Sequence, residues 1–114
     1  MVNGIRRYLF NTNPFDKNFM AAVYILYSRK INRFYIGSCL DLQQRLQQHK
    51  EKIFTSAYTA RADDWELFFE LSDLQLIQAR AAESYIKSRK SPRFIQSLKM
   101  ATTEDAMKKL RIDS

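Results

Sequence analysis

Two short segments with four residues between them constrain the fold of this chain more than any other feature. Residues 23–28 (Val-Tyr-Ile-Leu-Tyr-Ser) and 33–37 (Arg-Phe-Tyr-Ile-Gly) are rich in β-branched and aromatic residues, which favour β-strands. Residues 29–32 have the length and polarity of a turn. Together they predict an antiparallel β-hairpin.

The length of the turn also determines which residues of the hairpin face each other. It pairs Leu26 with Tyr35 and Tyr24 with Gly37. Opposed residues share a face of a sheet, so Tyr24 and Tyr35 are predicted to be diagonal neighbours on one face, about 7–8 Å apart. Gly37, opposite Tyr24, leaves space beside the tyrosine ring.

A helix is predicted to follow the hairpin, over residues 41–52. Asp41 and Gln44 at its start resemble a capping box. Arg45 and His49, the single histidine, are four residues apart and therefore lie on one helical face. Residues 53–64 have mixed composition and are expected to form a loop.

Residues 65–71 alternate between apolar and polar side chains, which predicts a third strand. The alternation assigns four apolar residues to one face: Trp65, Leu67, Phe69 and Leu71. A helix capped by Ser72 and Gln75 is expected to run to about residue 89, with two apolar stripes that predict burial on two sides.

Two short helices are predicted at the C-terminus. Ser91 and Pro92 have the order of an N-cap and a first helical residue, and this helix is expected to end at residue 98 or 99. Thr102 opens a last helix over residues 104–111. The order of elements predicts an α/β (α+β) fold: a small three-stranded antiparallel β-sheet flanked by helices.

The composition limits the classes of protein to consider. The 114 residues are enough for one domain, expected over 21–114, with residues 1–20 as a loosely ordered arm. The net charge of +7 favours a polyanionic partner such as nucleic acid. Cys39 is the single cysteine, which excludes an internal disulfide. No apolar run reaches the length of a membrane span or of a signal peptide, so no membrane association and a cytoplasmic location are expected.

Several side chains in this frame suit phosphodiester hydrolysis. The reaction needs a deprotonated and aligned water, neutralisation of charge on the phosphorane, and stabilisation of the leaving oxygen. Tyr24, Tyr35 and His49 are candidates for proton handling. Arg45 suits the phosphate because its planar guanidinium binds two oxygens and keeps its charge.

The spacing of these residues resembles a known family. The pattern Tyr24-x10-Tyr35-Ile36-Gly37-x7-Arg45-x3-His49 is similar to that of the GIY-YIG nucleases, in their small single-domain form. Residues 35–37 match the second signature of the family, whereas residues 22–24 (Ala-Val-Tyr) keep only the tyrosine of the first. The resemblance covers residues 22 to about 98.

The resemblance implies a metal-dependent endonuclease acting on DNA, with RNA not excluded. It implies a Mg²⁺ ion, with Mn²⁺ possible, held by a glutamate on the helix after the third strand, and the matching residue is Glu83. An i, i+4 pair with Lys87 is the structural alternative for this glutamate. Several members also use an asparagine about fifteen residues further on, where this chain has Gln96 and Ser97.

A basic cluster near the C-terminus is a candidate for holding substrate phosphates. It consists of Lys87, Arg89, Lys90, Arg93 and Lys99. Two other functions remain open: a non-catalytic nucleic-acid-binding module with the same fold, supported by the missing asparagine, and a protein-interaction domain without affinity for DNA. The residues leave open the form of the substrate, the oligomeric state and which tyrosine acts as base.

Overall fold

The computed structural model describes residues 20–51 and 58–113. The elements follow one another as β1 (Ala21–Ser28), β2 (Arg33–Cys39), α1 (Leu42–Lys50), the 3-10 helix η2 (Thr59–Arg61), β3 (Glu66–Leu74), α2 (Leu76–Arg89), α3 (Pro92–Lys99) and α4 (Thr103–Lys109). The predicted arm lies outside the described residues, apart from Met20. No helix in the described part of the chain is long and apolar enough to cross a bilayer.

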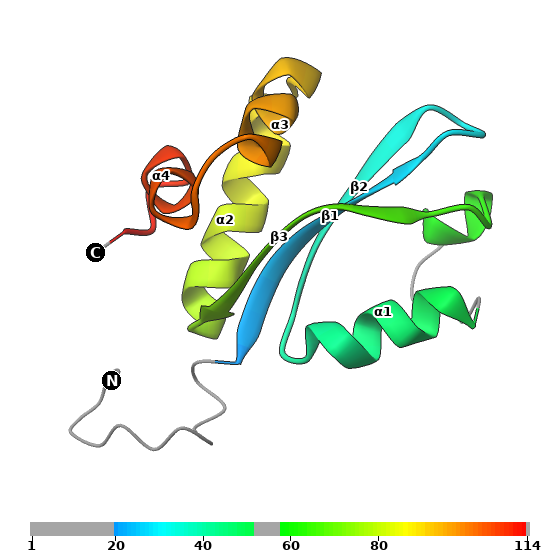
Figure 1. Ribbon diagram of the computed structural model, residues 1–114, viewed down its shortest axis with the longest axis horizontal. Helices are drawn as coiled ribbons and strands as arrows, with labels where there is room; N and C mark the ends of the chain where they lie inside the picture. Colours follow the sequence, from blue (N-terminus) through cyan, green and yellow to red (C-terminus); the bar gives the residue numbers. More distant parts are fainter. Residues whose placement is uncertain (1–19, 52–57, 114) are drawn as a thin grey trace.

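The three strands form one antiparallel sheet with the order β2-β1-β3, which confirms the predicted fold class. α1 covers one face of this sheet, and α2 covers the other (Figure 1). The central strand β1 is buried along its length, and its side chains alternate between the two faces. Val23 and Ile25 belong to the core on the α2 side, whereas Tyr24 and Leu26 belong to the core on the α1 side.

The predicted hairpin register is confirmed. Tyr24 pairs with Gly37 and Leu26 pairs with Tyr35 across β1 and β2. The turn closes at Asn32, which has a positive φ of 53°. Asparagine tolerates this left-handed conformation better than most residues do. The register follows from the turn, because a four-residue connection leaves the two apolar segments one pairing that buries both.

The predicted faces of β3 are wrong. Leu67 pairs with Leu26, but Phe69 pairs with Ile25, so one extra residue, Phe68, is inserted between these pairs. Such a bulge sends the residues on its two sides to opposite faces of the sheet. Trp65 and Leu67 therefore lie on the α1 side, whereas Phe68, Phe69 and Leu71 pack on the α2 side.

The start of α2 also differs from the prediction. β3 continues to Leu74, so Ser72 lies in a strand and not at a helix cap. The cap is Gln75, whose side chain forms a reciprocal capping box with Gln78. α2 is buried on one side and not two: Ala79 and Ile86 are in the core, but Ile77 is 74% exposed.

The other caps follow the sequence closely. The Gln44 amide donates to the Asp41 carboxylate at the start of α1, which ends at Lys50. Ser91 accepts from the backbone of Phe94 at the start of α3, and Thr102 accepts from Asp105 at the start of α4. Each side chain satisfies a backbone donor that the first helical turn leaves unpaired.

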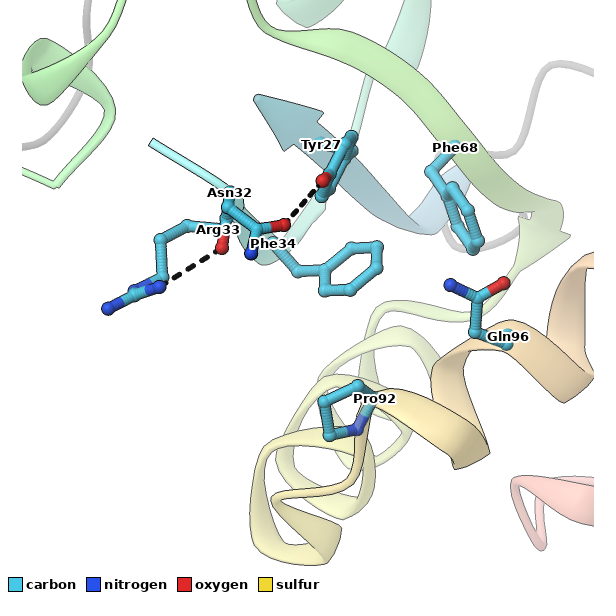
Figure 2. A pocket seen from close by; sticks show the side chains of 7 residues that line it. All are labelled: Tyr27, Asn32, Arg33, Phe34, Phe68, Pro92 and Gln96. Carbon is cyan, nitrogen blue, oxygen red and sulfur yellow. Dashed lines mark hydrogen bonds between the residues drawn. The ribbon is translucent and has the colours of Figure 1, made fainter. Parts of the chain in front are cut away.

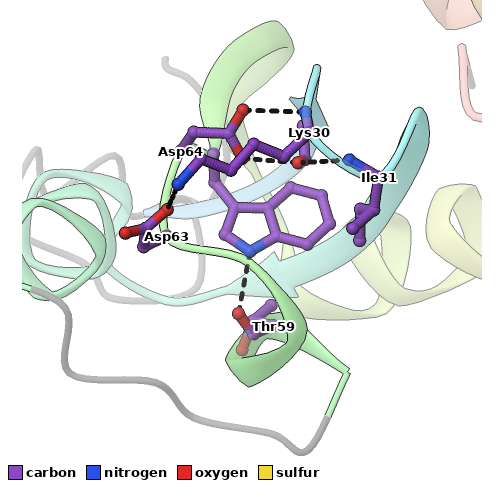
Figure 3. Close-up of polar contacts among 7 residues, drawn as sticks. Lys30, Ile31, Thr59, Asp63 and Asp64 are labelled. Carbon is purple, nitrogen blue, oxygen red and sulfur yellow. Dashed lines mark hydrogen bonds and ion pairs between the residues drawn. The ribbon is translucent and has the colours of Figure 1, made fainter.

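A polar clamp fixes the hairpin turn to the loop before β3. Ser28 is fully buried, and its hydroxyl donates to Asp64 at 2.5 Å. The second Asp64 oxygen accepts from the Lys30 amide at 3.0 Å, and Lys30 also pairs with Asp63 (Figure 3). Hydrogen bonds, first of all that from Ser28, lower the pKa of Asp64 below its usual value. The carboxylate thus satisfies a hydroxyl that burial would otherwise leave without a partner.

We expect Asp64→Ala to lower the melting temperature clearly more than Asp63→Ala, because only Asp64 partners a buried hydroxyl. The Asp63 pair with Lys30 is exposed and contributes little. The folded Asp64 pKa lies below the unfolded value of about 3.9, so its contribution is present above that pH and is lost as the pH falls through the folded pKa. Thermal melts from neutral to acid pH test both points. Equal melting temperatures for the two variants would contradict a stabilising role of the Ser28–Asp64 clamp.

Candidate active site

Tyr24 lies at the centre of the α1-facing side of the sheet. The side chain is fully buried, and Arg45 Nη1 donates to its hydroxyl oxygen at 3.0 Å. Burial raises the pKa of Tyr24 to about 12, although the nearby Arg45 guanidinium favours the phenolate. Tyr24 is therefore a neutral phenol at physiological pH.

Gly37 makes the position of Tyr24 possible. A β-carbon at residue 37 would lie 2.7 Å from the Tyr24 hydroxyl oxygen and 2.8 Å from Cζ, closer than nonbonded atoms approach. Glycine is the residue that leaves this space, as the sequence predicts. The contact with Tyr24 thus explains on steric grounds why the third residue of the Tyr35-Ile36-Gly37 signature is glycine.

Tyr35 extends the same face toward an aromatic wall. Its ring centroid lies 6.2 Å from that of Tyr24, which confirms the predicted shared face. The rings of Tyr58 and Trp65 lie 5.8 and 6.3 Å from that of Tyr35. Tyr35 is half-buried, whereas Tyr24 is fully buried. Of the two tyrosines, Tyr35 is the one within reach of solvent.

Arg45 and Tyr24 meet because α1 is held over the sheet by its apolar residues. Leu42 is buried against Tyr24 and Leu26, with Leu46 packed beside them. This contact directs Arg45, three residues after Leu42, toward the sheet. His49 lies one turn further along α1. Its side chain is outside the part of the chain that the structure describes.

A pocket of about 320 Å³ opens beside Arg45 at the end of the edge strand β2. Its lining includes Ser38 from β2, Gln48 from α1 and Arg80 from α2. Because β2 is an edge strand, residues from both faces of the sheet reach this pocket. Asp41 also lines the pocket, and the two arginines leave it with a net positive charge suited to an anion.

Glu83 approaches the same edge from the α2 side. Ser38 Oγ, which lines the pocket, donates to Glu83 Oε1 at 2.5 Å. Lys87 Nζ pairs with Glu83 Oε2 at 2.6 Å, so the structural alternative for this carboxylate is present. The Glu83 side chain is 23% exposed and Lys87 is 55% exposed. The carboxylate is thus accessible to a cation from solvent.

The carboxylates described at this site are Glu83 and Asp41, and Asp41 caps the start of α1. Within residues 20–51 and 58–113, no three His, Cys, Asp or Glu side chains gather in a group able to hold a metal ion. Mg²⁺ is commonly bound by one or two carboxylates, with water and substrate phosphate as the other ligands. Glu83 supplies a hard oxygen donor of this kind and fits such an ion.

The basic cluster lies at the C-terminal end of α2 and along α3. Arg89, Lys90, Arg93 and Lys99 are exposed. The Arg89 guanidinium stacks 5.2 Å from the Phe94 ring centroid, and Lys99 Nζ lies 4.6 Å from that of Phe68. These cation–π contacts hold the charged ends of Arg89 and Lys99 over aromatic rings at the surface.

Two residues at the site were missed from the sequence. Ser38 follows Gly37 directly, but nothing in the pattern singles out its hydroxyl. Arg80 precedes Glu83 by three residues, so helical spacing places both on one face, and this signal could have identified it. Gln96, a candidate for the missing asparagine, lines a different pocket, and Ser97 donates to its own helix at Phe94.

Comparison with known proteins agrees with this arrangement. The family model of the GIY-YIG catalytic domain matches residues 20–97, which is more than half of the chain. Searches of curated proteins and of solved structures found no match. The chain therefore belongs to the GIY-YIG family, as the resemblance in sequence indicates.

We expect the free energy of unfolding to fall less steeply at alkaline pH in the Tyr24→Phe variant than in the wild type. The folded Tyr24 pKa of about 12 lies above the unfolded value of about 10, so its contribution is full below pH 10 and is lost as the pH rises toward 12. The loss in the free energy of unfolding attributable to Tyr24 is on the order of 3 kcal/mol. Urea unfolding of both proteins across this range measures it. If the free energy of unfolding depended on pH equally in both proteins, burial of Tyr24 would not be the cause of the loss at alkaline pH.

Proposed function

We propose that this GIY-YIG chain is a metal-dependent endonuclease that hydrolyses phosphodiester bonds of DNA. The observation that carries the proposal is the guanidinium of Arg45, held by the buried Tyr24 at a pocket whose Ser38 contacts Glu83. A fixed guanidinium can neutralise the negative charge of the phosphate, and an accessible carboxylate at the same sheet edge can bind a metal cation. Membership of a nuclease family supports the same reaction class.

Arg45 is assigned to the scissile phosphate. Water attack forms a new P–O bond while the bond to the leaving oxygen breaks, and negative charge accumulates on the phosphorane oxygens. The planar guanidinium can donate to two of these oxygens at once. Because Tyr24 already fixes its orientation, Arg45 needs little rearrangement when the charge develops.

The two tyrosines receive different roles in this proposal. Tyr24 is neutral and fully buried, so it serves as a positioning residue for Arg45. Tyr35 is half-buried on the same face and is assigned to orient the water and accept its proton, while its own phenolic proton passes to His49, one turn beyond Arg45 on α1. The leaving oxygen takes up a proton from solvent as the bond breaks.

Glu83 would hold Mg²⁺, or Mn²⁺, in place of its present contact with the Lys87 ammonium. When bound, this ion supplies charge neutralisation at the leaving oxygen. Lys87 is exposed and can turn toward solvent or toward a substrate phosphate. The cluster of Lys87, Arg89, Lys90, Arg93 and Lys99 would then contact the backbone of the nucleic acid without reading its sequence.

One observation favours the second candidate function, a non-catalytic nucleic-acid-binding module. Both Glu83 oxygens already have partners in Ser38 and Lys87, as a purely structural carboxylate would. The two functions differ in their requirement for metal. Cleavage of labelled linear, flap and junction DNAs with Mg²⁺, compared with EDTA, separates them, because the module binds in both and yields no product.

We expect Arg45→Lys to retain DNA binding and to lose about 100-fold or more in cleavage rate, because lysine keeps the charge but loses the fork. Arg29→Lys is the matched control: the same exchange in the exposed hairpin turn, outside the assigned site and the basic cluster, leaves cleavage nearly unchanged. Single-turnover cleavage and binding in EDTA give the two readouts. Wild-type cleavage by the Arg45 variant would show that this residue does not grip the phosphate.

We expect Glu83→Gln to abolish cleavage while leaving DNA binding in EDTA unchanged or stronger, since a negative charge leaves a phosphate-binding region. Its cost in unfolding free energy is under about 1 kcal/mol, as expected for a partly exposed ion pair. Glu66→Gln, on the exposed part of β3, serves as the control for the loss of one carboxylate. Undiminished Mg²⁺-dependent cleavage by the Glu83 variant would remove Glu83 from the site.

A further inference from the structure

A second pocket lies on the α2-facing side of the sheet, away from Arg45. Its volume is about 520 Å³, within the range of about 300–1,000 Å³ that is typical of small-ligand sites. The residues that line it are Tyr27, Asn32, Arg33, Phe34, Phe68, Pro92 and Gln96. Its walls thus come from the hairpin, from β3 and from α3.

The lining combines aromatic rings with a polar amide. The rings of Tyr27 and Phe34 lie 4.9 Å apart between centroids, and Phe34 meets Phe68 edge to face at 5.1 Å. Figure 2 shows Phe34, Phe68 and Gln96 pointing toward the same space, with Pro92 below. Phe34 and Phe68 are only half-buried, so the rings remain accessible from the pocket.

The bulge in β3 brings two consecutive phenylalanines to this side of the sheet. Phe68 lies on the α2 side by alternation from Leu67, and the extra residue turns Phe69 to the same side. With regular alternation, Phe68 and Phe69 would lie on opposite faces. A bulge that redirects a side chain is frequently found beside a functional site.

Positive charge surrounds the rings. Lys99 lies 4.6 Å above the Phe68 ring centroid, Arg33 stands at the rim, and Arg93 follows Pro92 on the exposed surface of α3. The carboxylates nearest in sequence, Glu66 and Glu70, are not part of the lining. An occupant that is flat, aromatic and attached to phosphate matches this combination of rings and cations.

The pocket shares a strand face with the Glu83 contact. Phe34 and Ser38 are four residues apart on β2, so both point to the α2 side. Four residues of strand span about 13 Å, which corresponds to about four nucleotides at about 3.4 Å along a stacked strand. One nucleic acid strand can therefore reach both positions along the sheet edge.

We propose that this pocket binds an unpaired nucleobase of the nucleic acid, a few nucleotides from the phosphate that is cut. The base stacks on the accessible rings, Gln96 hydrogen-bonds its edge, and Arg33, Arg93 and Lys99 contact the adjoining phosphates. The inference rests on the proposed nuclease function and adds the form of the substrate: a strand that is unpaired next to the cleavage point. A base within a duplex cannot enter the pocket.

The test measures base-dependent binding without cleavage. A labelled single-stranded oligothymidylate is compared with an abasic chain of the same length, in EDTA and at low salt. Stacking on aromatic side chains corresponds to about a 5- to 150-fold gain in affinity, so we expect the wild type to prefer the base-bearing chain by about tenfold or more. Fluorescence anisotropy gives the ratio of the two dissociation constants, which cancels the backbone electrostatics that both chains share.

Two variants place the effect in this pocket. Phe34→Leu keeps apolar bulk but removes the flat ring, and we expect it to bring the ratio close to one. Phe94→Leu, the same exchange on a half-buried ring that packs against Tyr85 outside the pocket, leaves the ratio unchanged. Gln96→Ala, at an exposed position of α3, lowers the ratio because it removes the hydrogen bond to the base edge, and it decides the matter if Phe34→Leu does not fold.

The proposal is overturned if the wild type binds both chains equally, or if the folded pocket variants keep the wild-type ratio. Neither result bears on catalysis, which the Arg45 variant tests separately in the presence of metal. If the protein shows the base-dependent ratio but never cleaves, the proposal for this pocket stands and the proposed nuclease function does not.

Discussion

The close approach of Tyr24 to Gly37 is the contact on which the rest of the site depends. Across this pair, the strands leave no room for a side chain at residue 37. The buried phenol in turn accepts a hydrogen bond from Arg45 and fixes that guanidinium. An arginine on an exposed helix would sample many rotamers, and this contact limits them before any substrate arrives.

The edge position of β2 explains how one short strand serves two faces. Tyr35 and Gly37 lie on the α1 side, whereas Phe34, Ile36 and Ser38 lie on the α2 side. A central strand would separate such groups with a continuous sheet. At an edge, a strand of nucleic acid can pass beside β2 and meet groups from both sides, as the assignments of Arg45 and Glu83 require.

The burial of polar groups divides the molecule into a rigid frame and an exposed functional rim. Ser28 is buried but bonded to Asp64, and the Trp65 indole donates to the Thr59 carbonyl at 2.8 Å. These bonds hold the hairpin turn and η2 to the residues directly before β3 (Figure 3). The residues assigned to phosphate, such as Arg93 and Lys99, stand outside this frame, where their charges remain hydrated.

The sequence by itself determined the hairpin, the pairing of Tyr24 with Gly37, the caps of α1, α3 and α4, and the family. These features are local, because a turn of four residues or a cap with its helical turn is set by neighbours along the chain. Tertiary structure alone decided the bulge at Phe68, the continuation of β3 through Ser72 to Leu74, which moves the cap of α2 to Gln75, and the raised pKa of Tyr24. Each depends on elements that are distant in the sequence: the pairing of β3 with β1 turns Phe69 and Leu71 to the α2 side and extends β3 to Leu74, and desolvation under α1 raises the pKa of Tyr24. Alternation of apolar residues cannot reveal such a reversal, because the extra residue of a bulge looks like any other residue of the strand.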